Sequence, residues 1–87
     1  MSYRVEIKKS AQKQVAALAR IDQRRVIAAI AGLADVPRPE GARKIVGAQD
    51  AYRIRVGDYR IVYEIVKRVL TVYVVRVAHR KDVYKGL

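Results

Sequence analysis

The sequence has no cysteine, a single histidine and only eight acidic residues among its 87 positions. Without cysteine, the chain forms no disulfide, no thiolate nucleophile and no cysteine-bound zinc site. One histidine and few carboxylates also argue against a metal site built from protein side chains. We therefore expect any chemistry of this protein to proceed without a metal or another cofactor.

Long apolar runs are lacking as well. The longest, VLTVYVV, has the length of a strand and falls well short of the ~18 apolar residues of a membrane span. The first ten residues, MSYRVEIKKS, contain no apolar stretch able to act as a signal peptide. The length fits a single domain, 1–87, which we expect in the cytoplasm and away from membranes.

Basic residues, in contrast, are in large excess. Nineteen Lys and Arg residues give a formal net charge of +11, and twelve of the nineteen are Arg. The guanidinium group suits bidentate contacts with phosphate and carboxylate groups. This balance indicates a polyanionic partner, either a nucleic acid, an acidic protein or both.

The first half of the chain reads as one strand and two helices. Residues 3–8 alternate apolar and polar side chains, which predicts a half-buried strand. Two stretches of helical spacing follow, with Ser10 and Asp22 as the expected N-caps. Pro37 and Pro39 end the second helix and begin a long loop, PRPEGARKIVGAQD, in which we expect no regular structure.

The second half reads as three strands. AYRIRV and YRIVYEIV flank a tight turn at Gly57-Asp58, and VLTVYVVRV is apolar on both faces, which predicts an interior strand. The order is β-α-α-β-β-β, followed by a short C-terminal tail or helix. The predicted fold class is α+β, a two-layer fold whose mostly antiparallel sheet is covered on one face by an N-terminal helical hairpin.

Basic residues gather on the sheet face that the helices leave uncovered. Arg53 and Arg55 are two positions apart on one strand, so their side chains point the same way. Arg60 follows the turn, and its alternation class allows it to share this face. An ordinary solvated sheet face is the alternative, although such faces normally mix charges. The further basic residues expected at this surface are Arg76, Arg80 and the loop residue Lys44.

Two side chains near the C-terminus have open roles. His79 is either a packed or solvated side chain at a strand end or a group for proton transfer or stacking. Tyr84 is either an apolar ring that docks the tail on the sheet or a participant in chemistry. The residues alone leave both alternatives open.

A set of Arg, Lys, His and Tyr side chains suits the cleavage of RNA through its own 2′-hydroxyl. This reaction needs a base for the 2′-OH proton, cations for the charge on the phosphate and an acid for the departing 5′ oxygen. A tyrosine, with an ordinary pKa near ~10, serves as the base only where positive charge lowers that value. Tyr84 therefore fits the role only if it lies among the arginines.

The segments KIVGAQDAYRIRVGDYRIVYEI and LTVYVVRVAHRKDVY resemble the RelE branch of the RelE/ParE toxin superfamily, over almost the whole chain. The resemblance implies a toxin of a type II toxin–antitoxin system: a metal-independent endoribonuclease, or mRNA interferase, that enters the ribosomal A site, contacts 16S rRNA and cleaves mRNA. It also implies a cognate acidic antitoxin that wraps the toxin in a hetero-oligomer, in keeping with the net charge of +11.

The same resemblance assigns roles to individual residues. It implies that Arg60 stabilises the transition state, that Arg80 acts as general acid or phosphate ligand, and that Tyr84 is the general base. It further implies RNA or phosphate binding by a second set of basic residues, Lys44, Arg53, Arg55, His79 and Lys81. Val46 is a departure, because some members of the family carry a basic residue there.

Two other functions remain as alternatives. One is a ParE-like inhibitor of DNA gyrase, which shares the fold and performs no RNA chemistry. The other is a non-catalytic module that binds RNA or the ribosome. A tyrosine among arginines favours the ribonuclease, because an inhibitor of gyrase does not need one.

Overall fold

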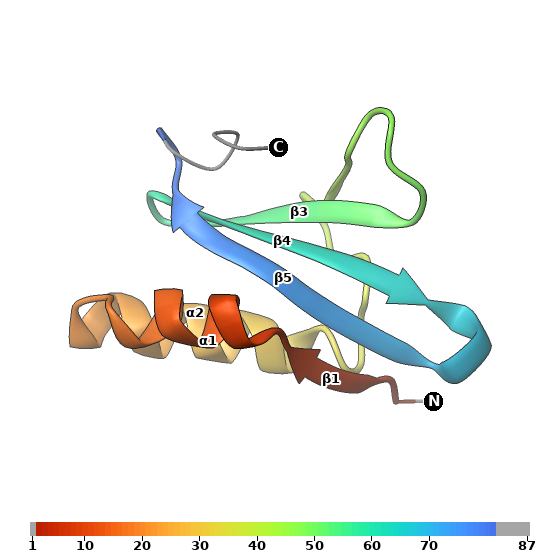
Figure 1. The fold of residues 1–87 in the computed structure, drawn as a ribbon, viewed down its shortest axis with the longest axis horizontal. Helices are drawn as coiled ribbons and strands as arrows, with labels where there is room; N and C mark the ends of the chain where they lie inside the picture. The colour runs from red at the N-terminus through yellow and green to blue at the C-terminus, as the bar shows by residue number, and fades with distance from the viewer. Residues whose placement is uncertain (1, 82–87) are drawn as a thin grey trace.

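The computed structural model describes residues 2–81 of the chain (Figure 1). Strand β1 is followed by two helices, α1 and α2, and then by four further strands; a short 3-10 helix separates the last two. The bounds are β1 Arg4–Ile7, α1 Lys9–Ala16, α2 Arg20–Gly32, β2 Arg43–Lys44, β3 Ala51–Val56, β4 Tyr59–Val66, the 3-10 helix Lys67–Val69 and β5 Thr71–His79.

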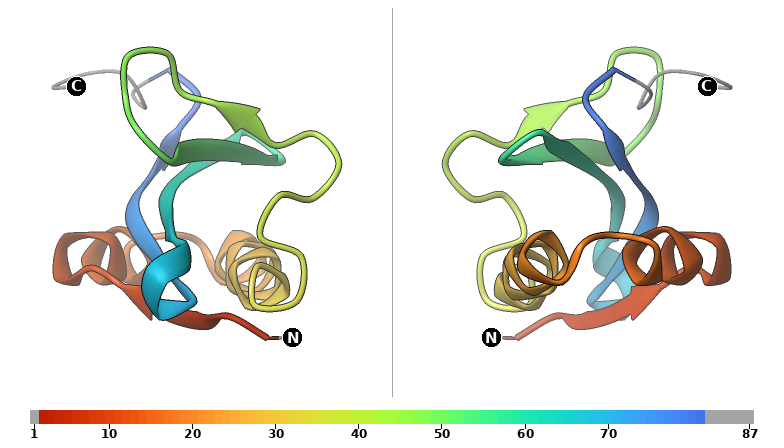
Figure 2. Two further views of the ribbon diagram at one scale, coloured as in Figure 1. Left: turned by 90° about the vertical axis from the view of Figure 1, so that its right-hand side faces the viewer. Right: turned by 90° about the vertical axis from the view of Figure 1, so that its left-hand side faces the viewer.

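The five strands form one sheet in the order β1-β5-β4-β3-β2. β1 runs parallel to β5, and the other neighbours are antiparallel. Both helices lie against the same side of this sheet (Figure 2). The predicted α+β class and its helix-covered sheet are confirmed, and β5 lies between two neighbours as its two apolar faces predict.

The expectation of an irregular loop after α2 is wrong at two residues. Arg43 and Lys44 form β2, which pairs with Arg53 and Tyr52 at the outer edge of β3. A two-residue strand leaves no periodic pattern in a sequence, so alternation alone cannot reveal it.

The predicted helix starts are also displaced. α1 begins at Lys9 after Lys8, and α2 begins at Arg20 after Ala19. Neither N-cap residue makes a side-chain capping hydrogen bond. Asp22 instead lies in the first turn of α2, where its carboxylate still interacts favourably with the positive end of the helix dipole.

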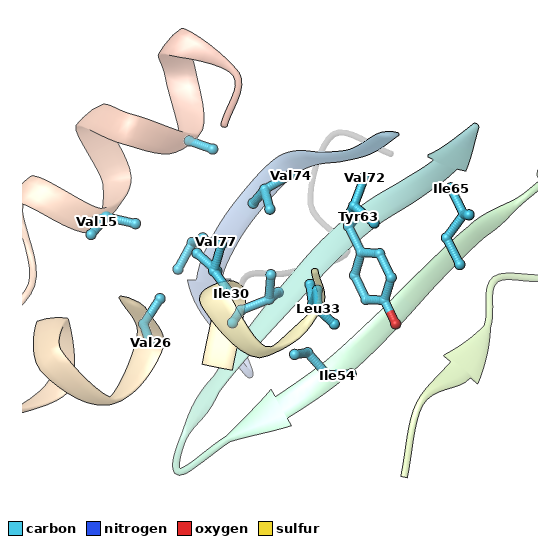
Figure 3. Close-up of a cluster of buried hydrophobic side chains, with 12 residues drawn as sticks. Val15, Val26, Ile30, Leu33, Ile54, Tyr63, Ile65, Val72, Val74 and Val77 are labelled. Atoms are coloured by element: carbon cyan, nitrogen blue, oxygen red, sulfur yellow. The ribbon is translucent and has the colours of Figure 1, made fainter. Parts of the chain in front are cut away.

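The core lies between the helices and the covered face of the sheet (Figure 3). Helical spacing turns Val26 and Ile30 of α2 toward the sheet, together with Leu33 at the C-cap of the helix. The strands contribute apolar side chains at alternate positions, with one interruption between Val74 and Val77 on β5. Among them are Ile54, Ile61, Tyr63, Ile65, Val72, Val74 and Val77. Burial of this set supplies the main driving force for folding.

Tyr63 links the core to the connection that follows α2. Its side chain is fully buried, and its hydroxyl donates a hydrogen bond to the carbonyl oxygen of Pro37 over 2.7 Å. Its ring stacks on that of Tyr52 with 6.0 Å between centroids. Burial, and to a lesser extent Tyr52, raises the pKa of Tyr63 to about 12 against the opposing effect of Arg38. The phenol therefore remains a hydrogen-bond donor well above neutral pH.

We predict that Tyr63→Phe lowers the free energy of unfolding by ~1 kcal/mol at neutral pH, the usual net value of one hydrogen bond. The folded pKa of about 12 exceeds the unfolded value. The stabilisation is therefore complete below about pH 10, the unfolded pKa, and is lost as pH rises toward 12. Urea unfolding at a series of pH values measures both effects.

Tyr73→Phe is the matched control, because Tyr73 is half-buried and lies on β5 on the sheet face away from the helices. This variant should lose stability at alkaline pH as the wild type does, whereas Tyr63→Phe should lose less. An equal decline in the wild type and in Tyr63→Phe would contradict the role given to Tyr63.

Candidate functional site

The sheet face away from the helices, here called the open face, carries five arginines in the two rows nearest the β3–β4 turn. β3 and β4 alternate so that Ile54 and Ile61 enter the core, which turns Arg53, Arg55 and Arg60 to the open face, as the sequence predicts. The two outer members come from β2 and β5. We call the set of Arg43, Arg53, Arg55, Arg60 and Arg76 the arginine cluster.

The cluster occupies two neighbouring rows across the strands. In the first row, Arg55 lies opposite Arg60, which lies opposite Ala78. In the second, Arg43 lies opposite Arg53, and Val62 separates Arg53 from Arg76. Like charges directly opposite one another destabilise a sheet, so this arrangement costs stability that an anionic ligand would restore.

Among the strand residues of the described range 2–81, acidic side chains of the open face first appear in the next row. Glu64 on β4 lies opposite Ala51 and Tyr73, and Glu6 on β1 lies opposite Tyr73. These carboxylates border the arginine cluster on the side away from the β3–β4 turn. The positive charge is therefore concentrated toward the turn, and the mixed charges expected of an ordinary solvated face begin one row away.

Arg80 is placed at the same end of the sheet by the turn itself. Its backbone N–H donates to the carbonyl oxygen of Asp58 over 2.7 Å. Gly57 makes this turn with φ of 58°, a conformation that a residue with a Cβ rarely adopts. Arg80 is exposed and adjoins the row of Arg55 and Arg60.

His79 lies on the other face from the cluster. It pairs with Tyr59, shares the alternation class of Val77 and Ile61, and packs its ring edge-on against Tyr59 with 5.7 Å between centroids. Its Nδ1 accepts a hydrogen bond from the backbone N–H of Lys81 over 3.2 Å. These contacts correspond to the packed alternative for His79, and the exposed Lys81 follows it in a turn.

The predicted loop contact, Lys44, lies in β2 opposite Tyr52 and so belongs to the helix-facing alternation class. Its neighbour Arg43, which is not among the expected RNA contacts, takes the position opposite Arg53 on the open face. Only the register of β2 distinguishes the two. Tyr84, the predicted general base, lies outside the described residues 2–81.

The cluster supplies cationic hydrogen-bond donors of fixed geometry. Guanidinium groups bind phosphate oxygens bidentately and stabilise charge that develops on them. Within residues 2–81, no group of three His, Cys, Asp or Glu side chains is arranged to hold a metal ion. None of the helices in that part of the chain is long and apolar enough to cross a membrane.

Solved structures of toxins share this fold. The RelE–RelB complex of the archaeon Pyrococcus horikoshii matches with a TM-score of 0.81 and 29% identity, covering 92% of this chain and 97% of that one. The antitoxin–toxin complex RelB–RelE of Methanococcus jannaschii matches with a TM-score of 0.77 and 27% identity, covering 94% and 98%. An Escherichia coli RelE variant in complex with a RelB peptide gives 0.78 and 26%, covering 97% and 92%.

A search of curated proteins found no match. The family model for the ParE toxin of type II toxin–antitoxin systems, parDE, matches residues 5–84, nearly the whole chain. The fold, the extent of the family match and the likeness to RelE toxins agree with one another. This chain therefore belongs to the RelE/ParE superfamily of type II toxin–antitoxin toxins, with the fold of its RelE members.

Proposed function

We propose that this toxin is a ribosome-dependent endoribonuclease that cleaves mRNA in the A site, in the cytoplasm, by attack of the 2′-hydroxyl on the adjacent phosphate. The observation that supports this most strongly is the arginine cluster, which places five guanidinium groups in two adjacent rows of the open face. Such a density of fixed cations matches a reaction whose main requirement is stabilisation of charge on a phosphate.

The residues divide by their position on the open face. Arg53 and Arg55 hold the RNA phosphates, and Arg60 stabilises the charge of the pentacoordinate phosphate. Arg80, beside the β3–β4 turn, serves as general acid or further phosphate ligand. Tyr84 is the proposed general base, three residues beyond the described part of the chain. No step in this scheme requires a metal ion.

Dependence on the ribosome follows from the shape of the site. The open face of a sheet contacts a single RNA strand from one side and does not enclose it. Orientation of the reacting groups is worth ~7–11 kcal/mol of the barrier. A ribosome that holds the A-site codon against 16S rRNA would supply much of this positioning.

An acidic antitoxin is the proposed protein partner. Its charge complements the +11 of the toxin. A groove of about 480 Å³ between α2 and β3 offers apolar surface beside that charge, and Arg55 belongs to both its lining and the arginine cluster. The apolar lining includes Leu33, Val36, Ile54 and Val56.

Inhibition of DNA gyrase is the second candidate, because the matching family model is that of the parDE toxins. A gyrase inhibitor would use the same fold to bind a protein and would need no cleavage chemistry. A non-catalytic RNA- or ribosome-binding module is the third candidate. Cleavage mapping distinguishes the ribonuclease from both.

We predict that the wild-type protein cuts mRNA at the A-site codon of programmed ribosomes. Arg80→Ala and Tyr84→Phe should each lower the cleavage rate about 100-fold or more, because this is the usual loss when one group that acts on the transition state is removed. Arg24→Ala, on the exposed side of α2, is the matched control for loss of charge and should cleave at the wild-type rate. Primer extension on the mRNA locates and quantifies the cuts.

Absence of cleavage by the folded wild type would contradict the ribonuclease. A gyrase supercoiling assay would then separate the second candidate from the third. Full activity of Tyr84→Phe would contradict the assignment of Tyr84 alone.

We also predict that Arg55→Gln stabilises the free toxin while it weakens RNA binding. Arg55 is exposed and lies directly opposite Arg60, so loss of its charge removes a repulsion worth ~0.2–1 kcal/mol. The gain should shrink as ionic strength rises, because salt screens exposed charges.

Thermal unfolding at low and high salt, together with RNA binding, measures both effects. Arg24→Gln should change neither quantity. A variant at Arg55 that lost stability at low salt would show that the cluster is not under repulsion.

A further inference from the structure

Strand β5 contains one extra residue, and this irregularity decides which side chains reach the open face. On β4, Val62 and Tyr63 are adjacent, yet their partners on β5 are Arg76 and Val74. Val75 is thus the additional residue of a β-bulge. A bulge leaves the extra residue out of the ladder and re-aims the side chains that follow.

The bulge resets the alternation of β5. Before it, Val72 and Val74 face the helices; after it, Val77 does so, and all three are buried. In an unbroken strand, Arg76 would share the face of Val72 and Val74 and would enter the core. The extra residue instead turns Arg76 to the open face, where it completes the second row of the arginine cluster.

A side chain from α1 meets the backbone just after the bulge. Gln14 accepts a hydrogen bond at its Oε1 from the backbone N–H of Val77 over 2.7 Å. The pairing of β1 with β5 ends at Ile7 and Val74, so β1 offers Val77 no partner. Val77 is only 2% exposed, and a buried N–H left without an acceptor is strongly unfavourable.

We infer that Gln14 is a positioning residue for the arginine cluster: its Oε1 holds the register of β5 after the bulge and thereby keeps Arg76 on the open face. Slipping the strand by one residue would remove Val77 N–H from Gln14 and return Arg76 to the helix side. The same segment of β5 leads to Arg80, which is fixed to Asp58 by its own backbone N–H. Gln14 and Asp58 thus accept hydrogen bonds from the backbone at the end of β5, at Val77 and just beyond the strand at Arg80.

The chain offers a matched control on the same helix. Gln12 also makes a hydrogen bond from α1 to a strand backbone, donating from Nε2 to the carbonyl oxygen of Ile7 over 2.8 Å. That bond concerns β1 and not β5. A purely structural role for such bonds would make Gln12 and Gln14 equivalent, whereas the positioning role makes them different.

The test compares Gln14→Met, Gln14→Glu and Gln12→Met with the wild type by NMR and by binding of a short single-stranded oligouridine at several salt concentrations. Methionine keeps the length of the side chain and removes the acceptor, whereas glutamate keeps an acceptor oxygen. In Gln14→Met we expect faster exchange of the Val77 amide and weakened NOEs between Val62 and Arg76. In Gln14→Glu and Gln12→Met we expect both to match the wild type.

The RNA measurement concerns Arg76 and rests on the proposed function. One lost phosphate contact lowers the slope of log affinity against log salt by about 0.7 for a single strand, and we expect this reduction together with about a tenfold weaker affinity at low salt. Wild-type slope and affinity in Gln14→Met, or an equal loss in Gln12→Met, would overturn the inference. If the wild type does not bind the oligouridine, the RNA measurement is moved to programmed ribosomes, whose cleavage tests the proposed function separately, and the amide exchange and NOEs still decide the role of Gln14.

A measurement on the wild type alone covers the case in which Gln14→Met does not fold. The hydrogen bond predicts a through-bond scalar coupling between the backbone nitrogen of Val77 and the side-chain carbonyl carbon of Gln14. Detection of that coupling supports the inference, and its absence in a well-resolved spectrum contradicts it.

Discussion

The arrangement of the core and of the arginine cluster depends on one constraint: the two helices cover a single face of the sheet. Side chains on a strand alternate between faces, so each apolar residue that enters the core sends its neighbours to the other side. Ile54 and Ile61 are buried, and Arg53, Arg55 and Arg60 are thereby brought together on the open face. Core packing and the assembly of the arginine cluster are two results of the same alternation.

The cluster works against the stability of the free protein. Arg55 faces Arg60 and Arg43 faces Arg53 across neighbouring strands, and such pairs repel. On the described part of β4, the first carboxylate of the open face is Glu64, one row away from the arginine cluster. Like charges placed side by side, at a cost in stability, are typical of functional sites. A polyanion bound to the open face, as proposed, would relieve the repulsion, so that affinity and stability would be coupled in this small domain.

Much of this architecture can be predicted from the sequence. Period-two alternation in AYRIRV and YRIVYEIV predicts both the core residues and the shared face of Arg53, Arg55 and Arg60, because a regular ladder preserves that pattern. The Gly57-Asp58 turn aligns the two strands without an insertion. The helical hairpin follows equally from apolar spacing, although its helices begin without the expected side-chain caps.

The features that cannot be predicted from the sequence are those that depend on the register of strand pairing. Val75 is an apolar residue in an apolar run, and nothing in VLTVYVVRV marks it as the bulge. The bulge nevertheless determines that Arg76 faces outward and that His79 lies beside Tyr59. In the same way, the choice between Arg43 and Lys44 depends on a two-residue strand. A one-residue difference in register exchanges the faces of a strand, so long-range contacts, and not local pattern, decide these positions.

The claim that the open face is the nucleic-acid interface has a direct test in the Nε–Hε resonances of individual arginines. During titration of the wild type with single-stranded RNA, we predict that the resonances of Arg53, Arg55, Arg60 and Arg76 shift together with a common affinity, because they share one surface. Those of Arg20 and Arg24 on α2 should stay in place. Equal shifts of the α2 arginines and the arginine cluster would show that RNA contacts the basic protein diffusely, and would contradict the assignment of the open face as the nucleic-acid interface.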